Sequence, residues 1–579
     1  MGEHGLISDS RSAALAAADG TLEWWCPRRY DASPILTRLL DPAGASVRVG
    51  PQAPVRTARG HQSYVDDTFI LRTVLTGADS VVEVTDFMPA SDTAVTGRIV
   101  RRLRVLRGPA DVVVSVALGT AEDVSVWGEG MSIDGVVVRC GLPFTRTSTR
   151  TSSRTSDVVS AAARLDTGEG LVVTIDPPGL VEDPLSVDGA GRLEERTASY
   201  WRRFAARVEI AGKWGPPAAR SALVARALSG LSGAPVSSPV TSLPRLIGGE
   251  RNADGRLARP VDAAAWCSCA SALGLWDEAD AAAEWMLDAL SHEAPLPSAL
   301  APDGSVPSSL STLPMPGYAR SQPVVSGIDL GERSSVEPAS AVISALARRG
   351  AIPHWERVIT HTDWIVDHWE DPDASIWALE PRDRRWTSAR LAARAALSAA
   401  AQSARSRKPL DLDAAGWQLA AQDIERWLLK SGAGPGGVLV AGTGSGLRSA
   451  TDASLVRVAT LGPWPAEDEV VRATVARVEE RLGFGPWVHP YSAEIDDGLP
   501  GSEPPSVAAT LWLAQALAVA GRWDEAHERM EAAVDLAGPL HLLPESVDGT
   551  TGKPLGNRPA AGSHIAFINA ALALSDAPA

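Results

Sequence analysis

The sequence predicts a multidomain protein of the β + α class, in which an antiparallel β region is followed by helices paired into a closed α/α toroid. The chain has 579 residues, which is more than one ordinary hydrophobic core supports. Its composition, 45% hydrophobic and 21% charged, is typical of a packed globular protein rather than a disordered one. The spacing of the apolar residues also changes along the chain, from a strand period to a helix period. These observations indicate two structurally different regions.

Apolar residues alternate with polar ones from about residue 60 to 210. The alternation is carried by the segments SYVDDTFILRTVL, DSVVEVTDFM, IVRRLRVLRG and ADVVVSVAL. Turns containing glycine, aspartate or proline separate these segments, as expected between antiparallel strands. Because alternation places the apolar side chains on one face, we expect a sheet with one buried face.

The helical period follows the segment ERTASYWRRFAARVEIAGKW at 195–214. We expect about eleven helices, at 217–231, 262–273, 277–290, 338–349, 353–369, 387–404, 412–430, 466–482, 505–519, 523–537 and 562–575. The element WDEA recurs at 276–279 and 523–526 after a glycine-containing turn, as helical hairpins require. A helical-repeat interaction protein, similar to a tetratricopeptide solenoid, is the alternative. Because no fixed period of about 34 residues connects the two copies, closed pairing of the helices is favoured.

Charge, termini and cysteines exclude several classes of function. The net charge is −16 and the basic residues are scattered, which argues against nucleic acid and other polyanions as ligands. No basic head with an apolar core opens the chain and no apolar run reaches membrane-spanning length, so we expect a cytoplasmic protein that does not bind a membrane. The cysteines are Cys26, Cys140, Cys267 and Cys269, and their spacing predicts neither a zinc site nor a disulfide.

Five parts of the chain carry recognisable motifs: LISDSRSAALAAADGTLEWWCPRRYDASPILTRLLD at 6–41, TSLPRLIGGERNADGR at 241–256, GYARSQPV at 317–324, SIWALEPRDRRWTSAR at 375–390, and the pair 496–513 and 541–571. In this order they resemble the bacterial glucoamylase and trehalase group of glycoside hydrolase family 15. The resemblance implies an N-terminal antiparallel β-sandwich over 1–194, a helical linker over 195–215 and an (α/α)6 barrel over 216–579. Loops of the inner helices would then build a sugar pocket.

The resemblance implies inverting hydrolysis of α-glucosidic bonds. In such enzymes one carboxylic acid protonates the leaving oxygen and a carboxylate on the opposite face activates water, with the two about 6.5–9.5 Å apart. Glu545, in LLPES, matches the base. The acid position differs, because Ser375-Ile376-Trp377-Ala378 stands where the family motif runs Gly-Ile-Trp-Glu. A methyl group cannot donate a proton, so Ala378 predicts impaired hydrolysis.

Glu380 is the candidate for a surrogate acid. It lies two residues after Ala378, which in an extended loop displaces its carboxylate by about 6–7 Å. An error of about one ångström is already costly in catalysis. The alternative interpretation is that Glu380 pairs with nearby arginines on the surface.

The sugar-contacting residues are only partly retained. In the segment RNADGRLARPVDA (251–263), the resemblance implies substrate-binding roles for Asp254, Arg256 and Asp262. The family pattern also has three aromatic residues, a small residue and an arginine that binds glucosyl hydroxyls. These are replaced here by Ala253, Gly255, Leu257, Arg259 and Val261. Trp377 is either a sugar-stacking side chain, as the resemblance implies, or a core tryptophan. The resemblance also implies a substrate-binding role for Glu503, although the residues around it differ from the family pattern.

Two hypotheses therefore follow from the sequence. The first is an α-glucosidic hydrolase of carbohydrate metabolism, acting on trehalose, a maltooligosaccharide or a related glucoside with Glu545 as base. The second is a catalytically inactive homologue that binds a saccharide or a protein partner. The resemblance implies a small saccharide as ligand and neither a metal nor an organic cofactor. The oligomeric state stays open, with a homo-oligomer among the alternatives.

Overall fold

The computed structural model describes residues 4–52, 60–91, 96–150, 155–180, 182–230, 232–329, 335–349, 353–380, 383–406 and 414–575. The chain divides into two compact units. Unit 1 comprises Met1–Arg207 with Pro314–Arg320, and unit 2 comprises Val208–Leu313 with Ser321–Ala579. The two are described separately below.

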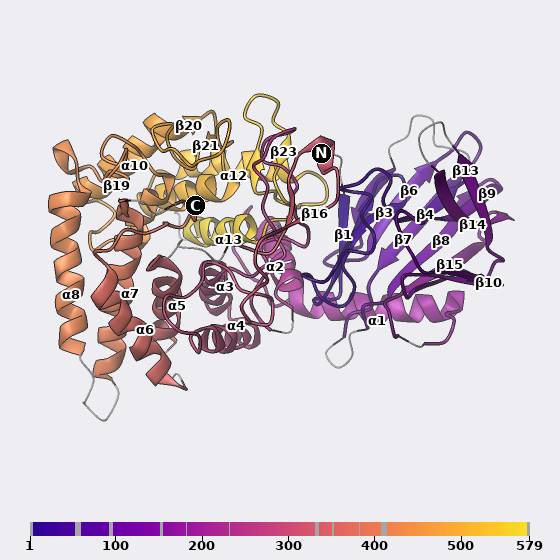
Figure 1. Ribbon diagram of the computed structural model, residues 1–579, viewed down its shortest axis with the longest axis horizontal. Helices are drawn as coiled ribbons and strands as arrows, with labels where there is room; N and C mark the ends of the chain where they lie inside the picture. The colour runs from indigo at the N-terminus through magenta and orange to yellow at the C-terminus, as the bar shows by residue number, and fades with distance from the viewer. Residues whose placement is uncertain are drawn as a thin grey trace. The chain divides into compact units, whose positions relative to one another are not determined.

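Unit 1 contains two antiparallel sheets (Figure 1). The strands are β1 (His4–Ser8), β2 (Ala13–Ala17), β3 (Thr21–Trp25), β4 (Ser46–Pro51), β5 (His61–Tyr64), β6 (Leu71–Thr76), β7 (Val81–Phe87), β8 (Ile99–Arg107), β9 (Ala110–Ala117), β10 (Val124–Trp127), β11 (Gly130–Ile133), β12 (Val136–Arg139), β13 (Thr145–Arg150), β14 (Thr155–Leu165) and β15 (Gly170–Asp176). One sheet has the order β1-β2-β3-β4-β9-β14-β13 and the other β10-β11-β12-β15-β8-β7-β6-β5. Contacts of β1 and β4 with β6, β7 and β8 join the sheets, which confirms the expected sandwich.

A buried ion pair lies within this sandwich. Arg101 on β8 and Asp86 on β7 are both fully buried, and Arg101 Nε donates to Asp86 Oδ1 at 2.7 Å. The guanidinium also donates to the backbone oxygens of Val47 and Gly20, each at 2.8 Å. Because every acceptor lies on a different strand or turn, the pair connects the two sheets through their interior.

Helix α1 (Val187–Ala205) packs on β8 and β15 of unit 1. The side chain of Ser186 caps its first turn by accepting a hydrogen bond from the Gly189 N–H at 3.1 Å. The helix therefore begins before the predicted linker at 195–215 and belongs to the same compact unit as the strands.

Unit 2 is built from paired helices (Figure 1). Their bounds are α2 (Gly215–Leu228), α3 (Pro260–Ala272), α4 (Trp276–Ala289), α5 (Glu337–Arg348), α6 (Trp355–His368), α7 (Thr387–Arg405), α8 (Ala414–Trp427), α9 (Val458–Leu461), α10 (Glu469–Leu482), α11 (Val507–Val519), α12 (Trp523–Ala537) and α13 (Ala561–Ser575). Short two-stranded hairpins lie in the connections, among them β16 (Ser311–Leu313) with β17 (Val324–Ser326) and β22 (Ser546–Val547) with β23 (Pro554–Leu555).

The helices of unit 2 form a closed ring within the described residues. In the inner ring α3 contacts α5, α5 contacts α7, α7 contacts α9, α9 contacts α11, α11 contacts α13, and α13 contacts α3. The helices α4, α6, α8, α10, α12 and α2 pack outside this ring in the same order, and several of them contact two neighbouring inner elements. This arrangement is the predicted (α/α)6 barrel.

The inner element between α7 and α11 is absent from the sequence-based expectation. It consists of the 3-10 turn η4 (Ala453–Arg457) continued by the single turn of α9. Asp452 caps η4 by accepting from the Ser454 N–H at 2.9 Å, and Gly462 ends the segment. Because a 3-10 turn followed by one helical turn does not sustain a 3.6-residue period, the apolar pattern could not reveal it. No helix in the described part of the chain has the length and apolarity to cross a bilayer.

Candidate functional site

Glu545, the predicted base, lies immediately before the β22–β23 hairpin. Asn557 holds its carboxylate from two sides, because the backbone N–H donates to Oε2 and side-chain Nδ2 donates to Oε1, each at 3.2 Å. Gly556 has φ +74°, and a Cβ at this position would lie 2.7 Å from Glu545 Oε2. Glycine is therefore required for the hairpin to approach the carboxylate this closely.

The charges near Glu545 oppose the effect of its burial. Burial raises the pKa of the Glu545 carboxyl, while the Arg245 guanidinium and the hydrogen bonds from Asn557 act in the opposite direction. Arg245 Nη1 also lies 3.2 Å from Glu503 Oε1. A hydrogen-bonded carboxylate with a raised pKa is well suited to accept a proton from water.

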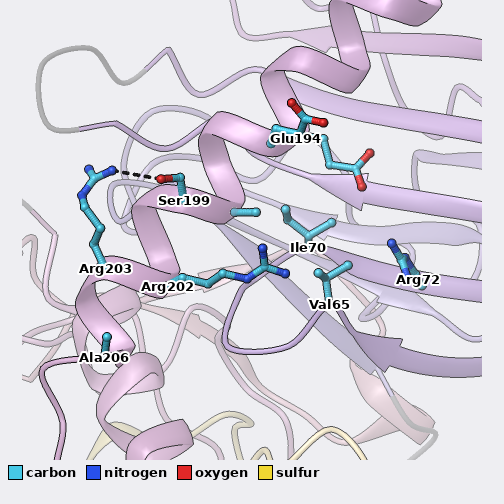
Figure 2. A pocket seen from close by; sticks show the side chains of 10 residues that line it. Val65, Ile70, Arg72, Glu194, Ser199, Arg202, Arg203 and Ala206 are labelled. Carbon is cyan, nitrogen blue, oxygen red and sulfur yellow. Dashed lines mark hydrogen bonds between the residues drawn. The ribbon is translucent and has the colours of Figure 1, made fainter.

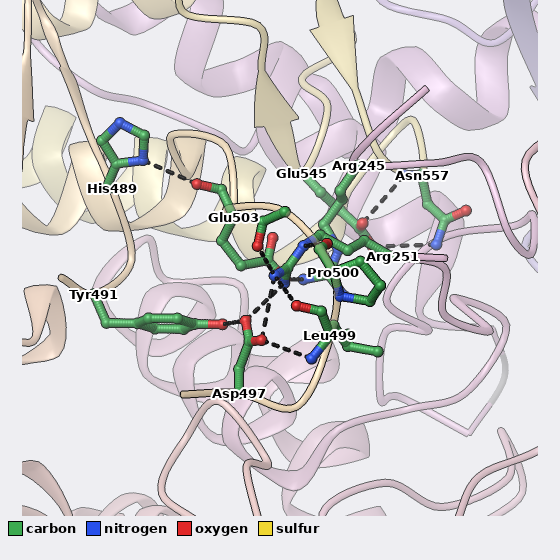
Figure 3. Close-up of polar contacts among 11 residues, drawn as sticks. Arg245, Arg251, His489, Tyr491, Asp497, Leu499, Pro500, Glu503, Glu545 and Asn557 are labelled. Atoms are coloured by element: carbon green, nitrogen blue, oxygen red, sulfur yellow. Dashed lines mark hydrogen bonds and ion pairs between the residues drawn. The ribbon is translucent and has the colours of Figure 1, made fainter. Parts of the chain in front are cut away.

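Arg251 gathers several acidic and backbone groups next to this base (Figure 3). Its Nη1 lies 2.7 Å from Asp497 Oδ2 and 3.2 Å from Glu503 Oε1. It also donates to the backbone oxygens of residues 499–501. The Tyr491 hydroxyl donates to Asp497 Oδ2 at 2.7 Å. Glu503, predicted to bind substrate, is thus engaged by two arginines and its side chain is only 8% exposed.

The loop at the acid position has an unusual backbone conformation. Ser375 and Ala378 have φ values of +57° and +53°, in the left-handed region that non-glycine residues rarely adopt. The Ala378 N–H donates to the Ser375 oxygen at 3.3 Å, which closes a tight turn. Ala378 is half-buried, whereas Glu380 is exposed at the end of this described segment. Glu380 is therefore more exposed to solvent than Glu545.

Trp377 connects this loop to the Arg251 neighbourhood. Its indole Nε1 donates to Asp452 Oδ1 at 2.8 Å. Its ring lies 6.0 Å from the Tyr491 ring and 5.8 Å from the Trp512 ring, measured between centroids. Burial raises the pKa of the Asp452 carboxyl. Trp377 is half-buried, so its ring is supported by the core and keeps an accessible part.

Asp254 and Arg256 form a bidentate ion pair in which both side chains are 2% exposed. Arg256 Nε and Nη2 donate to the two Asp254 oxygens at 2.8 and 2.9 Å. The pair also contacts the β16–β17 hairpin, because Arg256 Nη2 donates to Ser326 Oγ at 3.0 Å and the Gly327 N–H donates to Asp254 Oδ2 at 2.9 Å. These contacts occupy both Asp254 oxygens and make the pair a structural support for the 251–263 segment.

Asp262 and Arg259 lie at the start of α3. Burial raises the pKa of the Asp262 carboxyl, and Arg259 lowers it. A Cβ built on Gly562 would lie 3.4 Å from Asp262 Oδ1, so the start of α13 packs against this carboxyl. Arg259 Nη2 donates to the Ile376 oxygen at 2.8 Å. A guanidinium therefore contacts the same loop that carries Ala378.

Sequence reasoning did not identify several residues of this site. They are Arg245, Arg251, Tyr491, Asp497 and Asn557, which surround Glu545 and Glu503. Arg245 and Arg251 stand in the quoted segment TSLPRLIGGERNADGR, and Asn557 stands in VDGTTGKPLGN. For Arg245, Arg251 and Asn557, the one available signal was their position within segments that resemble the family. That position does not indicate which acidic side chain each of them contacts.

A separate groove of about 540 Å³ lies in unit 1 (Figure 2). It is lined by Val65, Ile70, Arg72, Glu194, Glu195, Ala198, Ser199, Arg202, Arg203 and Ala206. Its charged groups are mixed in sign, and Arg203 Nη1 donates to Ser199 Oγ at 3.3 Å. The lining has no aromatic ring on which a sugar could stack, so the groove does not resemble a saccharide site.

Comparisons with known proteins match nearly the whole chain. Residues 220–572 match the family described as Glycosyl hydrolases family 15, and residues 1–121 match the family described as Trehalase-like, N-terminal. A trehalase of Thermoplasma volcanium is 26% identical over 99% of this chain and 93% of its own length. A trehalase of Thermoplasma acidophilum is 30% identical over 67% of each chain.

A solved structure shows the same fold. It is a bacterial glucoamylase complexed with acarbose, with a TM-score of 0.72 and 13% sequence identity, and the match covers 99% of this chain and 94% of that one. The fold class predicted from the sequence, a β-sandwich followed by an (α/α)6 barrel, is confirmed.

Proposed function

The chain belongs to glycosyl hydrolases family 15, and from this we propose that it acts on an α-glucoside of the trehalose or maltooligosaccharide type with Glu545 as general base and without a general acid at Ala378. The observation that carries this proposal is the contrast between the two positions. Glu545 is held by two hydrogen bonds from Asn557, whereas position 378 offers a methyl group in a tight turn.

The retained half of the chemistry is water activation. Glu545 would take a proton from a water molecule as the water oxygen bonds to the anomeric carbon, which inverts the configuration. Arg245 favours the ionised carboxylate that this step needs. Asn557 fixes its orientation.

The missing half is protonation of the leaving oxygen. A sugar alkoxide is a poor leaving group, and a positioned acid typically contributes a factor of about 10²–10⁴. Hydrolysis of trehalose or maltose should therefore be slow. A glucosyl compound whose leaving group departs without a proton should react much faster.

α-Glucosyl fluoride tests the proposal, because fluoride hardly needs protonation. We expect the chain to hydrolyse α-glucosyl fluoride with release of β-glucose and to turn over trehalose and maltose at least about 100-fold more slowly. Glu545→Gln should abolish the fluoride reaction. Rapid trehalose hydrolysis that Glu380→Gln abolishes would instead assign the acid role to Glu380.

A saccharide- or protein-binding homologue without turnover is the second candidate. It is favoured by the ion pairs that occupy Asp254, Arg256 and Glu503, since these side chains then have fewer groups left to bind sugar hydroxyls. Titration calorimetry with trehalose and maltose, alongside the fluoride assay, separates the two. Binding of a saccharide with no fluoride turnover would select this second candidate.

A further inference from the structure

Arg259 places a cation beside the loop that lacks an acid. Its Nη2 donates to the Ile376 oxygen at 2.8 Å, and Ile376 is two residues before Ala378. Among the described residues the other N–H groups of this guanidinium have no hydrogen-bond partner, and the side chain is half-buried. The loop has therefore a methyl group at the acid position and unused charged donors nearby.

The other arginines of the site are already engaged. Arg251 is bonded to Asp497, Glu503 and three backbone oxygens. Arg245 pairs with Glu503. Asp262 lies near enough to Arg259 for the guanidinium to lower the pKa of its carboxyl, although the two form no ion pair in the described part of the chain. Arg259 is thus a cation beside the Ala378 loop that, among the described residues, has donors left for a ligand.

These features suit a leaving group that is anionic and needs no proton. We propose that the site takes glycosyl phosphates, in which the phosphate is the leaving group and the Arg259 guanidinium stabilises the charge that develops on it. This inference rests on the proposed function of Glu545 as base. The Arg259 guanidinium would act in place of the missing acid. A planar guanidinium can bind phosphate oxygens with two parallel hydrogen bonds, so it can stabilise the departing anion without donating a proton.

The reaction balances without another reactant. Water attacks the anomeric carbon from the face of Glu545, which accepts one water proton, while the bond from the anomeric carbon to the phosphate oxygen breaks. The electron pair of that bond stays on the oxygen, so the leaving group departs as an anion, either inorganic phosphate from a monoester or a nucleoside diphosphate from a diphosphate. The products are the sugar of inverted configuration and this anion, and Glu545 later releases its proton to solvent.

The net charge of −16 does not exclude a small anion. Exposed charges farther than about 8–10 Å are largely screened at physiological ionic strength. Arg259 acts at contact distance, where one charge-assisted donor aimed at developing charge is typically worth a factor of about 10²–10³ in rate.

The test compares three substrates on the full chain: α-glucosyl phosphate, a nucleoside diphosphate α-glucose and α-glucosyl fluoride. The measurements are release of inorganic phosphate, nucleoside diphosphate and fluoride, with the anomer of the sugar read by proton NMR. We expect turnover of one of the two phosphate compounds with release of β-glucose. Which of them reacts identifies whether the phosphate is a monoester or part of a diphosphate.

Arg259 variants test its role. Arg259→Met should lower the ratio of phosphate-substrate to fluoride turnover by about 100-fold, and Arg259→Lys should lie between this variant and the parent. Arg448→Met is the matched control, because Arg448 also donates to one backbone oxygen, that of Ser431, on the exposed surface. Thermal unfolding checks that each variant is folded.

The outcomes separate this inference from the proposed function. Turnover of the fluoride without turnover of either phosphate compound overturns the inference and leaves the function of Glu545 intact. The inference is also overturned if folded Arg259→Met and Arg259→Lys keep the parent's ratio of phosphate-substrate to fluoride turnover. Turnover of none of the three substrates overturns both proposals.

Discussion

Replacement of Ala378 by glutamate should restore part of the hydrolysis of trehalose and maltose. A positioned general acid contributes a factor of about 10²–10⁴, which corresponds to about 3–5 kcal/mol of barrier. The backbone at this position already carries a Cβ at φ +53°, so the longer side chain adds no new strain of this kind. We therefore expect Ala378→Glu to fold and to supply the missing proton donor.

Arg259 should limit this gain. Its guanidinium is bonded to the Ile376 oxygen, and two residues of chain cannot separate position 378 from Ile376 by more than about 7 Å. An opposite charge at about 4–6 Å lowers the pKa of a carboxyl by about 1–3 units. Because an ionised carboxyl cannot donate a proton, Arg259 should lower the pH at which the activity of Ala378→Glu falls on the alkaline side of its profile, while Glu545 must still be ionised on the acid side. Adding Arg259→Met should extend its activity to higher pH.

Glucose release from trehalose and maltose between pH 4 and 8 is the assay, with Ala378→Gln as the matched variant of equal size. The expected result is a large gain for glutamate and none for glutamine. Equal rates for the two variants, while both still hydrolyse α-glucosyl fluoride, would refute the assignment of position 378 to the acid.

Three further predictions concern the base and the β-sandwich. Arg245→Met removes a charge that favours ionised Glu545, so the pKa of this carboxyl should rise further and the acid limb of the pH profile for fluoride hydrolysis should move to higher pH. Asn557→Ala removes both bonds to the Glu545 carboxylate and should lower kcat for the fluoride by about 10- to 100-fold, measured at the pH optimum. Asp86→Ala leaves the buried Arg101 guanidinium without its counter-charge and should destabilise unit 1 by about 3–5 kcal/mol in denaturant unfolding; a loss below about 1 kcal/mol would contradict this account.

Local periodicity was sufficient to predict most of the secondary structure. Strands β6 to β9 lie in the alternating segments, because a strand in a sandwich presents every second side chain to one core. The helical period predicted the long barrel helices for the corresponding reason. The inner element at 453–461 was missed, since its 3-10 turn and single helical turn sustain no period and its position depends on the ring that it closes.

Residue identity and local spacing were sufficient to predict the two regions, the family resemblance, and the contrast between Glu545 and Ala378. The pairing of Glu503 with Arg245 and Arg251, the pairing of Asp254 with Arg256, and the contact of Arg259 with the Ala378 loop became visible in the folded chain. Pairing of charges depends on distances between side chains, and the barrel brings together segments that are separated by more than a hundred residues in the chain.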